Sequence, residues 1–180
     1  MGAKKLEILR ELVPDATTIA LLVNPANPPG TTERADIEAA AHALGLQIQI
    51  VDASNDSDFE TASTTLARQR PSAILIGSDP LFVNRREQLV ALAARLRLPA
   101  LYSLREFVLA GGLISYGTHL TDAYRQGGVY TGKILKGTKP AELPVMQPTA
   151  FDLVINLRTA KALGIKVPLD LQVAADEVIQ

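Results

Sequence analysis

The chain has 180 residues and is 47% hydrophobic, which is enough to bury a core, and its length suits one domain or one large lobe with appendages. Its net charge of −1 gives no general positive field for phosphate backbones, so we expect no nucleic-acid partner. The absence of cysteine excludes disulfides, thiolate metal sites and a cysteine nucleophile.

At the amino end, residues 1–5 are followed by no apolar h-region, and no apolar stretch in the chain reaches the roughly 18 residues of a transmembrane helix. We therefore expect a soluble chain without an export signal. Residues 3–13 then place leucines at helical spacing, with Lys4 and Lys5 predicted on the opposite, polar face. A first strand is predicted over residues 18–23.

The first strand ends in a polar corner at residues 24–30, and the next helix is predicted to be capped by Thr31 or Thr32 and to end at Gly45. A second strand covers residues 46–51 and alternates polar with apolar residues, which favours a place near the edge of the sheet.

The third strand, residues 73–77, is a short apolar run that ends at Ser78 and Asp79. Two capping boxes are predicted, Ser57 with Glu60 before this strand and Asn84 with Glu87 after it.

Two further strands are predicted over residues 100–102 and 113–116. Alternation of strands and helices over more than a hundred residues is typical of an α/β fold, an open parallel sheet with helices on both faces. We expect the flavodoxin-like strand order 2-1-3-4-5.

The character of the chain changes from Leu120. A helix predicted over residues 121–135 contains adjacent glycines at 127 and 128, which indicate that something approaches that face closely. Beyond it, residues 151–155 read as a strand, Asn156 as a helix cap and residues 174–179 as a final strand.

The order of strands places a ligand crevice between the carboxyl ends of strands one and three. The candidate ligand-binding residues are Asn24, Asn27, Ser78, Asp79, Tyr102 and Tyr116. Asn24 has an alternative role as a turn residue before Pro25. Each tyrosine is either a rim aromatic against a ligand or an ordinary edge residue.

Asp79 also has two interpretations. It is either an N-cap with Pro80 at the first helical position, or an exposed, ionised hydrogen-bond acceptor. Because Asn84 and Glu87 provide a better predicted cap, we favour the exposed acceptor.

Catalytic motifs are missing from the sequence. It contains no G-x-S-x-G elbow, Walker loop or H-E-x-x-H motif, and its two histidines, at 42 and 119, are far apart. We therefore expect no enzymatic activity, no cofactor and no metal site.

Several segments are similar to those of a known family: Leu9–Pro14, Leu22–Pro28, Arg85–Ala93, Arg105–Phe107 with Gly111–Gly112, Ile114–Gly117 and Ile134–Gly137. Together they resemble the substrate-binding proteins of ABC transporters with the type I periplasmic-binding fold, in the subgroup of tryptophan- and tyrosine-type binders. The resemblance runs from about residue 4 to 179 and matches the carboxyl-terminal half of such proteins.

This resemblance implies that residues 4–112 form one α/β ligand-binding lobe. Residues 113–180 would supply a crossover at Ile114–Gly117, a helix and a returning tail that complete a two-lobed protein. The implied function is a fragment of the solute-binding component of an ABC importer, for an amino acid or similar small polar molecule held in an interlobe cleft.

The implied partners are the solute, a membrane permease and a missing amino-terminal lobe, and the implied location is the periplasm. Since the missing lobe would leave the helix at 121–135 uncovered, we also expect a homodimer of this fragment. Two other functions stay open: an effector-binding domain of a transcriptional regulator, and a flavodoxin-like enzyme or phosphoacceptor.

Overall fold

A computed structural model describes residues 1–146 and 151–180. Within these ranges seven strands form one sheet in the order β2-β1-β3-β4-β5-β6-β7, which confirms the predicted order 2-1-3-4-5 and extends it. All neighbouring strands are parallel except β5 and β6. The strands are Thr18–Val23 (β1), Gln47–Asp52 (β2), Ala73–Ile76 (β3), Ala100–Tyr102 (β4), Ile114–Thr118 (β5), Phe151–Asn156 (β6) and Glu177–Ile179 (β7).

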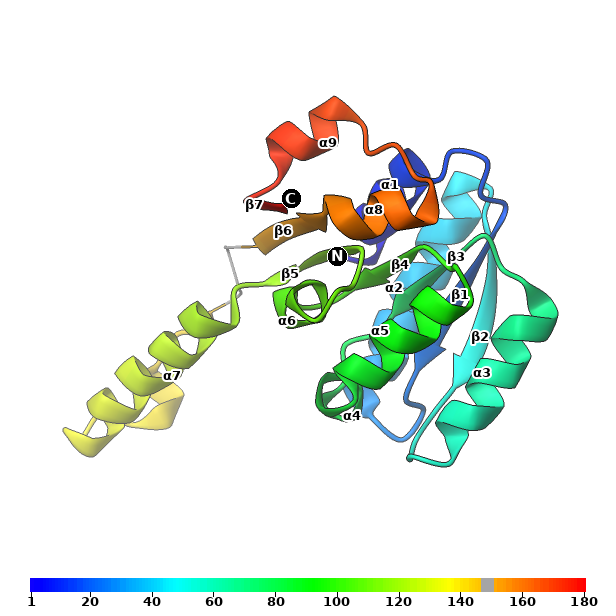
Figure 1. Ribbon diagram of the computed structural model, residues 1–180. Coiled ribbons are helices and arrows are strands. Elements are labelled where there is room, and N and C mark those ends of the chain that lie inside the picture. Colours follow the sequence, from blue (N-terminus) through cyan, green and yellow to red (C-terminus); the bar gives the residue numbers. More distant parts are fainter. Residues whose placement is uncertain (147–150) are drawn as a thin grey trace.

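Helices cover both faces of the sheet, as expected (Figure 1). One face packs against Gly2–Leu12 (α1), Pro28–Leu44 (α2), Leu157–Leu163 (α8) and Leu169–Ala174 (α9). The other face packs against Asp58–Gln69 (α3), Pro80–Asn84 (α4), Arg86–Arg95 (α5) and Arg105–Leu109 (α6).

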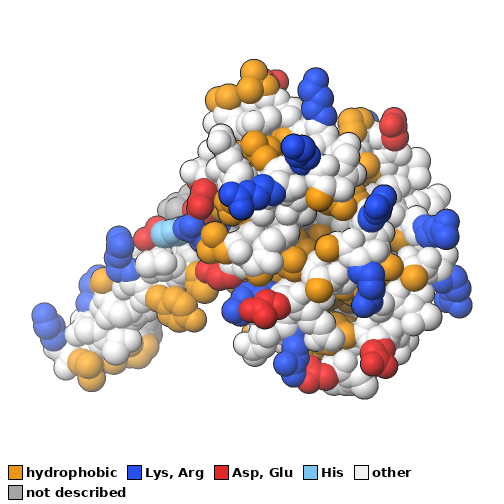
Figure 2. Space-filling model, viewed as in Figure 1, with side chains coloured by type: hydrophobic (Ala, Val, Ile, Leu, Met, Phe, Trp, Pro, Cys, Tyr) orange, Lys and Arg blue, Asp and Glu red, His pale blue; other side chains and the backbone are white. Residues whose placement is uncertain are grey.

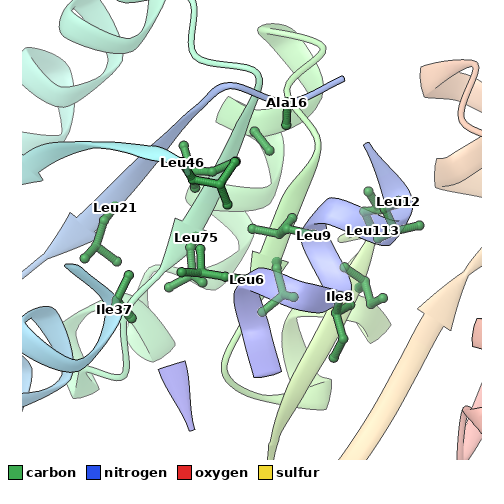
Figure 3. Packing of buried hydrophobic residues seen from close by; sticks show 14 of the residues in the cluster. Leu6, Ile8, Leu9, Leu12, Ala16, Leu21, Ile37, Leu46, Leu75 and Leu113 are labelled. Carbon is green, nitrogen blue, oxygen red and sulfur yellow. The ribbon is translucent and has the colours of Figure 1, made fainter. Parts of the chain in front are cut away.

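The central strand β1 shows why both faces are filled. Its residues alternate between two hydrophobic clusters, with Ile19 and Leu21 in one and Ala20 and Leu22 in the other. Figure 3 shows the first cluster, where Leu6 and Leu9 of α1 lie between their helix and the sheet. A strand buried on both sides needs a continuous apolar run, and residues 19–23 supply one.

Helix starts depart from several sequence predictions. α2 begins at Pro28 with Asn27 as its N-cap, earlier than the predicted caps Thr31 and Thr32, because proline suits the first helical turn. Neither predicted capping box forms. Ser57 donates its hydroxyl to Asn55 instead, and Asn84 closes α4. Asn156 does cap α8, accepting from the Thr159 amide at 3.1 Å.

Strand β5 stays within the sheet, hydrogen-bonded between β4 and β6. After Thr118 the chain leaves the body along the projecting helix Leu120–Leu135 (α7) (Figure 1). The crossover toward a second lobe at Ile114–Gly117 stays a prediction. The short 3₁₀ helix Pro140–Glu142 (η1) follows. Residues 147–150 of the predicted 113–180 segment lie outside the described residues. None of the described helices is long and apolar enough to span a bilayer.

Gly117 allows β5 to pass very close to the loop that follows β4. A Cβ atom added at Gly117 would lie 1.8 Å from the backbone oxygen of Ser103, inside the contact distance of any two atoms. The glycines of α7 differ, because a Cβ added at Gly127 or Gly128 would have no described atom within 4 Å apart from the neighbouring backbone of α7 itself. The close approach predicted for those two glycines is not seen within the described chain.

We predict that Gly117→Ala lowers the free energy of unfolding by about 3 kcal/mol, because either β5 or the Ser103 loop must shift. The matched control is Gly127→Ala, which should leave stability unchanged or raise it by up to about 1 kcal/mol through helix propensity. Urea unfolding followed by circular dichroism measures both. Equal effects of the two substitutions on the free energy of unfolding would show that the close contact with Ser103 does not restrict residue 117 to glycine.

Candidate functional site

An open cleft of about 540 Å³ lies at the carboxyl ends of the central strands. Its lining comes from the loops after β1, β3 and β4, from the end of β5 and from the start of α7. The lining residues that carry side-chain oxygen or amide groups are Asn27, Ser78, Asp79, Asn84, Ser103, Thr118 and Tyr124. Three of the six predicted site residues, Asn27, Ser78 and Asp79, therefore share one cleft.

Asp79 organises the cleft wall. One of its carboxylate oxygens accepts from the Leu81 amide at 2.8 Å and so caps α4, while the other accepts from the Asn27 side chain at 2.7 Å. The side chain is not the exposed acceptor that was favoured, since Asp79 is only 6% exposed. The capping interpretation was correct, because the competing box at Asn84 does not form.

The bond between Asn27 and Asp79 joins the loops that follow β1 and β3. The two strands are neighbours, so their polar corners flank one crevice, as predicted. A charge-assisted hydrogen bond of this kind is stronger than a neutral one and holds the two loops at a fixed distance.

A buried ion pair supports this wall from behind. Lys5 is completely buried, and its ammonium donates to Glu33 at 2.6 Å. The second carboxylate oxygen of Glu33 accepts from the Ser78 amide at 2.8 Å. Three elements, α1, α2 and the end of β3, therefore meet at one carboxylate. The prediction that Lys5 lies on the exposed face of its helix is wrong.

The other three predicted residues do not line the cleft. Asn24 accepts from the Ala26 amide at 3.0 Å, which is the turn role left open above. Tyr102 is buried and stacks on Phe107 with ring centroids 4.8 Å apart, and burial raises the pKa of its hydroxyl well above the usual value. Tyr116 stacks on Phe151 at 5.8 Å in the pairing of β5 with β6. Tyr102 is therefore a core residue, whereas Tyr116 is partly buried outside this cleft.

Several cleft residues were missed from the sequence. Ser103, Thr118 and Tyr124 reach the cleft because the loop after β4, the end of β5 and the first turns of α7 lie at the same end of the sheet as the loop after β3. Lys5 could have been found, since it falls with Leu9 and Leu12 on one helical stripe at spacings of four and three.

An exposed ion pair lies outside the cleft, at the same end of the sheet. Arg85 forms a two-point contact with Asp56, and the hydrogen bond from the guanidinium is the main reason that the pKa of the Asp56 carboxyl is lowered. The pair joins the loop before α3 to the junction of α4 and α5. Among the described residues no group of three or more acidic or histidine side chains is arranged to hold a metal ion.

The sequence model for ABC transporter substrate binding proteins matches residues 2–179. The chain belongs to this family. Proteins of the family are not enzymes, in agreement with the prediction that this chain is not a catalyst. No curated protein sequence matches the chain.

Solved structures of substrate-binding proteins share the fold. An ABC domain from Streptococcus pneumonia in complex with L-Trp is 25% identical, with a TM-score of 0.92 over 99% of this chain and 62% of that chain. A conserved domain protein from Vibrio cholerae is 23% identical, with a TM-score of 0.91 over 98% of this chain and 60% of its own.

A ligand-free, open substrate-binding protein from Clostridium difficile is 19% identical, with a TM-score of 0.72 over 98% of this chain and 59% of that one. The chain thus spans about three fifths of the length of these solved structures.

We predict that Glu33→Gln costs about 3 to 5 kcal/mol of stability, because the Lys5 ammonium then stays buried without a counter-charge. Glutamine keeps an oxygen for the Ser78 amide, so the substitution tests the charge itself. The control is Glu38→Gln, which removes the solvent-exposed partner of Arg34 and should change stability by no more than about 0.5 kcal/mol. Urea unfolding measures the stability of both variants. Losses of stability of the same size would show that the ion pair between Lys5 and Glu33 does not support the cleft wall.

Proposed function

We propose that this chain forms part of the solute-binding component of an ABC importer and that the cleft at the carboxyl ends of β1, β3 and β4 holds a small polar solute of the amino-acid class. The observation that carries the proposal is the bond between Asn27 and Asp79, which fixes two loops of different strands at the edge of the cleft. Ligands of open α/β sheets bind at this position.

The chemistry of the cleft suits an amino acid. Asp79 has accepted two hydrogen bonds and, as a carboxylate, retains lone pairs for an ammonium group. The Ser78 hydroxyl is exposed beside it, and Pro80, Val83 and Leu120 give the same cleft an apolar part. A volume of about 540 Å³ lies within the range of small-molecule sites.

The remaining parts of the proposal concern the rest of the protein. Since matched structures are longer than this chain, we propose a second lobe that closes over the cleft in the whole protein. The importer would include a membrane permease as partner, and the periplasm would be the compartment. Membership of the substrate-binding family favours this function over a transcriptional regulator.

Binding by the chain alone should be weak, because one wall of the cleft supplies only part of the contacts. We predict that a panel of L-amino acids at millimolar concentration, added to the ¹⁵N-labelled chain, shifts the amide resonances of Ser78, Asp79 and Ser103. Asn27→Ala should weaken the best ligand by about tenfold, equivalent to one polar contact of about 1.4 kcal/mol.

The matched control is Asn24→Ala, three residues away, whose side chain serves a local turn outside the cleft. It should leave affinity within about twofold. Equal affinity in both variants would remove Asn27 from the site. Shifts confined to another surface, or no shifts with any amino acid, would contradict the proposed ligand class.

The arm formed by α7 also needs a partner surface. Tyr124, Gly128, Thr131 and Leu135 recur at helical spacing, and Tyr124 and Leu135 are 73% and 82% exposed. Figure 2 shows hydrophobic side chains along this arm. We propose that the second lobe covers this stripe in the whole protein and that a second copy covers it in the isolated chain.

The isolated chain should therefore sediment as a dimer at micromolar concentration. Leu135→Glu should give a monomer, because a carboxylate placed in an apolar contact is left without a partner. Leu169→Glu, at a residue of α9 that is 72% exposed, is the control and should leave the dimer intact. A monomer in the unsubstituted chain would disprove the association.

A further inference from the structure

A second cavity, of about 480 Å³, opens at the amino ends of the strands, opposite the solute cleft. Its walls are the two loops that enter β3 and β4, after α3 and α5. Leu66, Pro71, Leu98 and Pro99 supply an apolar floor, and Arg70, Arg95 and Arg97 supply the charge. The cavity is independent of the solute cleft and of the function proposed for it.

The backbone at two of these arginines is unusual. Arg70 has φ 46° and ψ 58°, and Arg97 has φ 50°, which is the left-handed region that residues with a Cβ atom rarely adopt. They are the only residues other than glycine with positive φ in the described part of the chain. At other turns with positive φ, such as Gly45 and Gly164, the chain uses glycine.

Compensation of the helix dipole does not account for these arginines. A cation in the last turn of a helix would interact with the dipole equally well from an ordinary conformation, as Arg68 in α3 and Arg95 in α5 do. Arg70 lies one position beyond the end of α3 and Arg97 two positions beyond the end of α5, and at both positions glycine would relieve the strain. The strain at two neighbouring loops that face one cavity therefore points to a role for the side chains themselves.

The charge of the cavity is not balanced by the protein. No acidic residue lines it, and within the described residues none of its three arginines forms an ion pair. Arg95 donates to the Ser63 hydroxyl at 2.9 Å. This local excess of positive charge occurs in a chain whose net charge is −1, so it is a property of this cavity and not of the whole surface.

We propose that Arg70, Arg95 and Arg97 form a binding site for a phosphate group. A guanidinium group donates two parallel hydrogen bonds to the oxygens of one phosphate. Three guanidinium groups around one concave site suit a doubly charged phosphate better than a singly charged carboxylate ligand. The phosphate belongs either to a free anion or to a lipid headgroup. The site lies at the opposite end of the sheet from the solute cleft, so both can be occupied together.

The test uses inorganic pyrophosphate in calorimetry at low ionic strength, and flotation with vesicles of phosphatidylglycerol against vesicles of phosphatidylcholine. Pyrophosphate binding assigns a free anion, and selective flotation with phosphatidylglycerol assigns a headgroup. Arg70→Gly and Arg97→Gly should each weaken binding at least about tenfold while raising the melting temperature, because glycine removes both the charge and the strain.

Arg68→Gln is the matched control. It removes the same charge from an exposed position of α3 that does not line the cavity, and it should leave binding within about twofold. The proposal fails if neither probe binds, if Arg68→Gln weakens binding as much as the glycine variants, or if the glycine variants bind normally. A fall in melting temperature in both glycine variants would also overturn it, because strain would then not be present.

Discussion

The buried ion pair between Lys5 and Glu33 is the contact on which the candidate cleft depends. Removing the Lys5 charge from water is costly, and the partly exposed Glu33 offsets that cost, with one carboxylate oxygen accepting from Lys5 and the other from the Ser78 amide. The corner that carries Ser78 and Asp79 is thereby tied to the helix whose N-cap is Asn27. The polar wall of the cleft is formed before any ligand arrives, which lowers the cost of ordering it on binding.

The two ends of the sheet have opposite character. At the carboxyl ends an amide, hydroxyls and a carboxylate line one cleft, and the carboxylate of Asp79 accepts from the Asn27 side chain and from the Leu81 backbone amide. At the amino ends three arginines surround a cavity without any acidic residue. The backbone also differs between the two ends. At the carboxyl ends Gly117, which has no side chain, lets β5 pass close to the Ser103 loop. At the amino ends Arg70 and Arg97 have positive φ although they carry side chains, and the backbone there is strained.

Membership of the substrate-binding family gives the projecting helix α7 a physical interpretation. One side of α7 shares a groove with residues 140–146, where Tyr130 donates to the Pro144 carbonyl, while Tyr124 and Leu135 stay largely exposed. Apolar side chains left exposed add little stability through burial, which supports the proposal that another surface covers them. The body of the chain does not need that partner to complete its sheet, because β5, β6 and β7 pair within it.

The sequence by itself determined the fold class, the strand order around β1 and the cleft end of the sheet. Apolar runs that alternate with helical patterns predict a parallel sheet. Because the crossovers between parallel strands are right-handed, only a few strand orders are then possible. Asn27, Ser78 and Asp79 follow from that topology alone. The helical stripe of Leu9 and Leu12 includes Lys5, but only the tertiary structure decided that Glu33 is its counter-charge, since Glu33 lies 28 residues away. It also decided between the two interpretations of Asp79, which is buried and bonded to Asn27, 52 residues away, and it decided that Tyr102 faces the core. Burial depends on neighbours contributed by other elements, which local spacing does not encode.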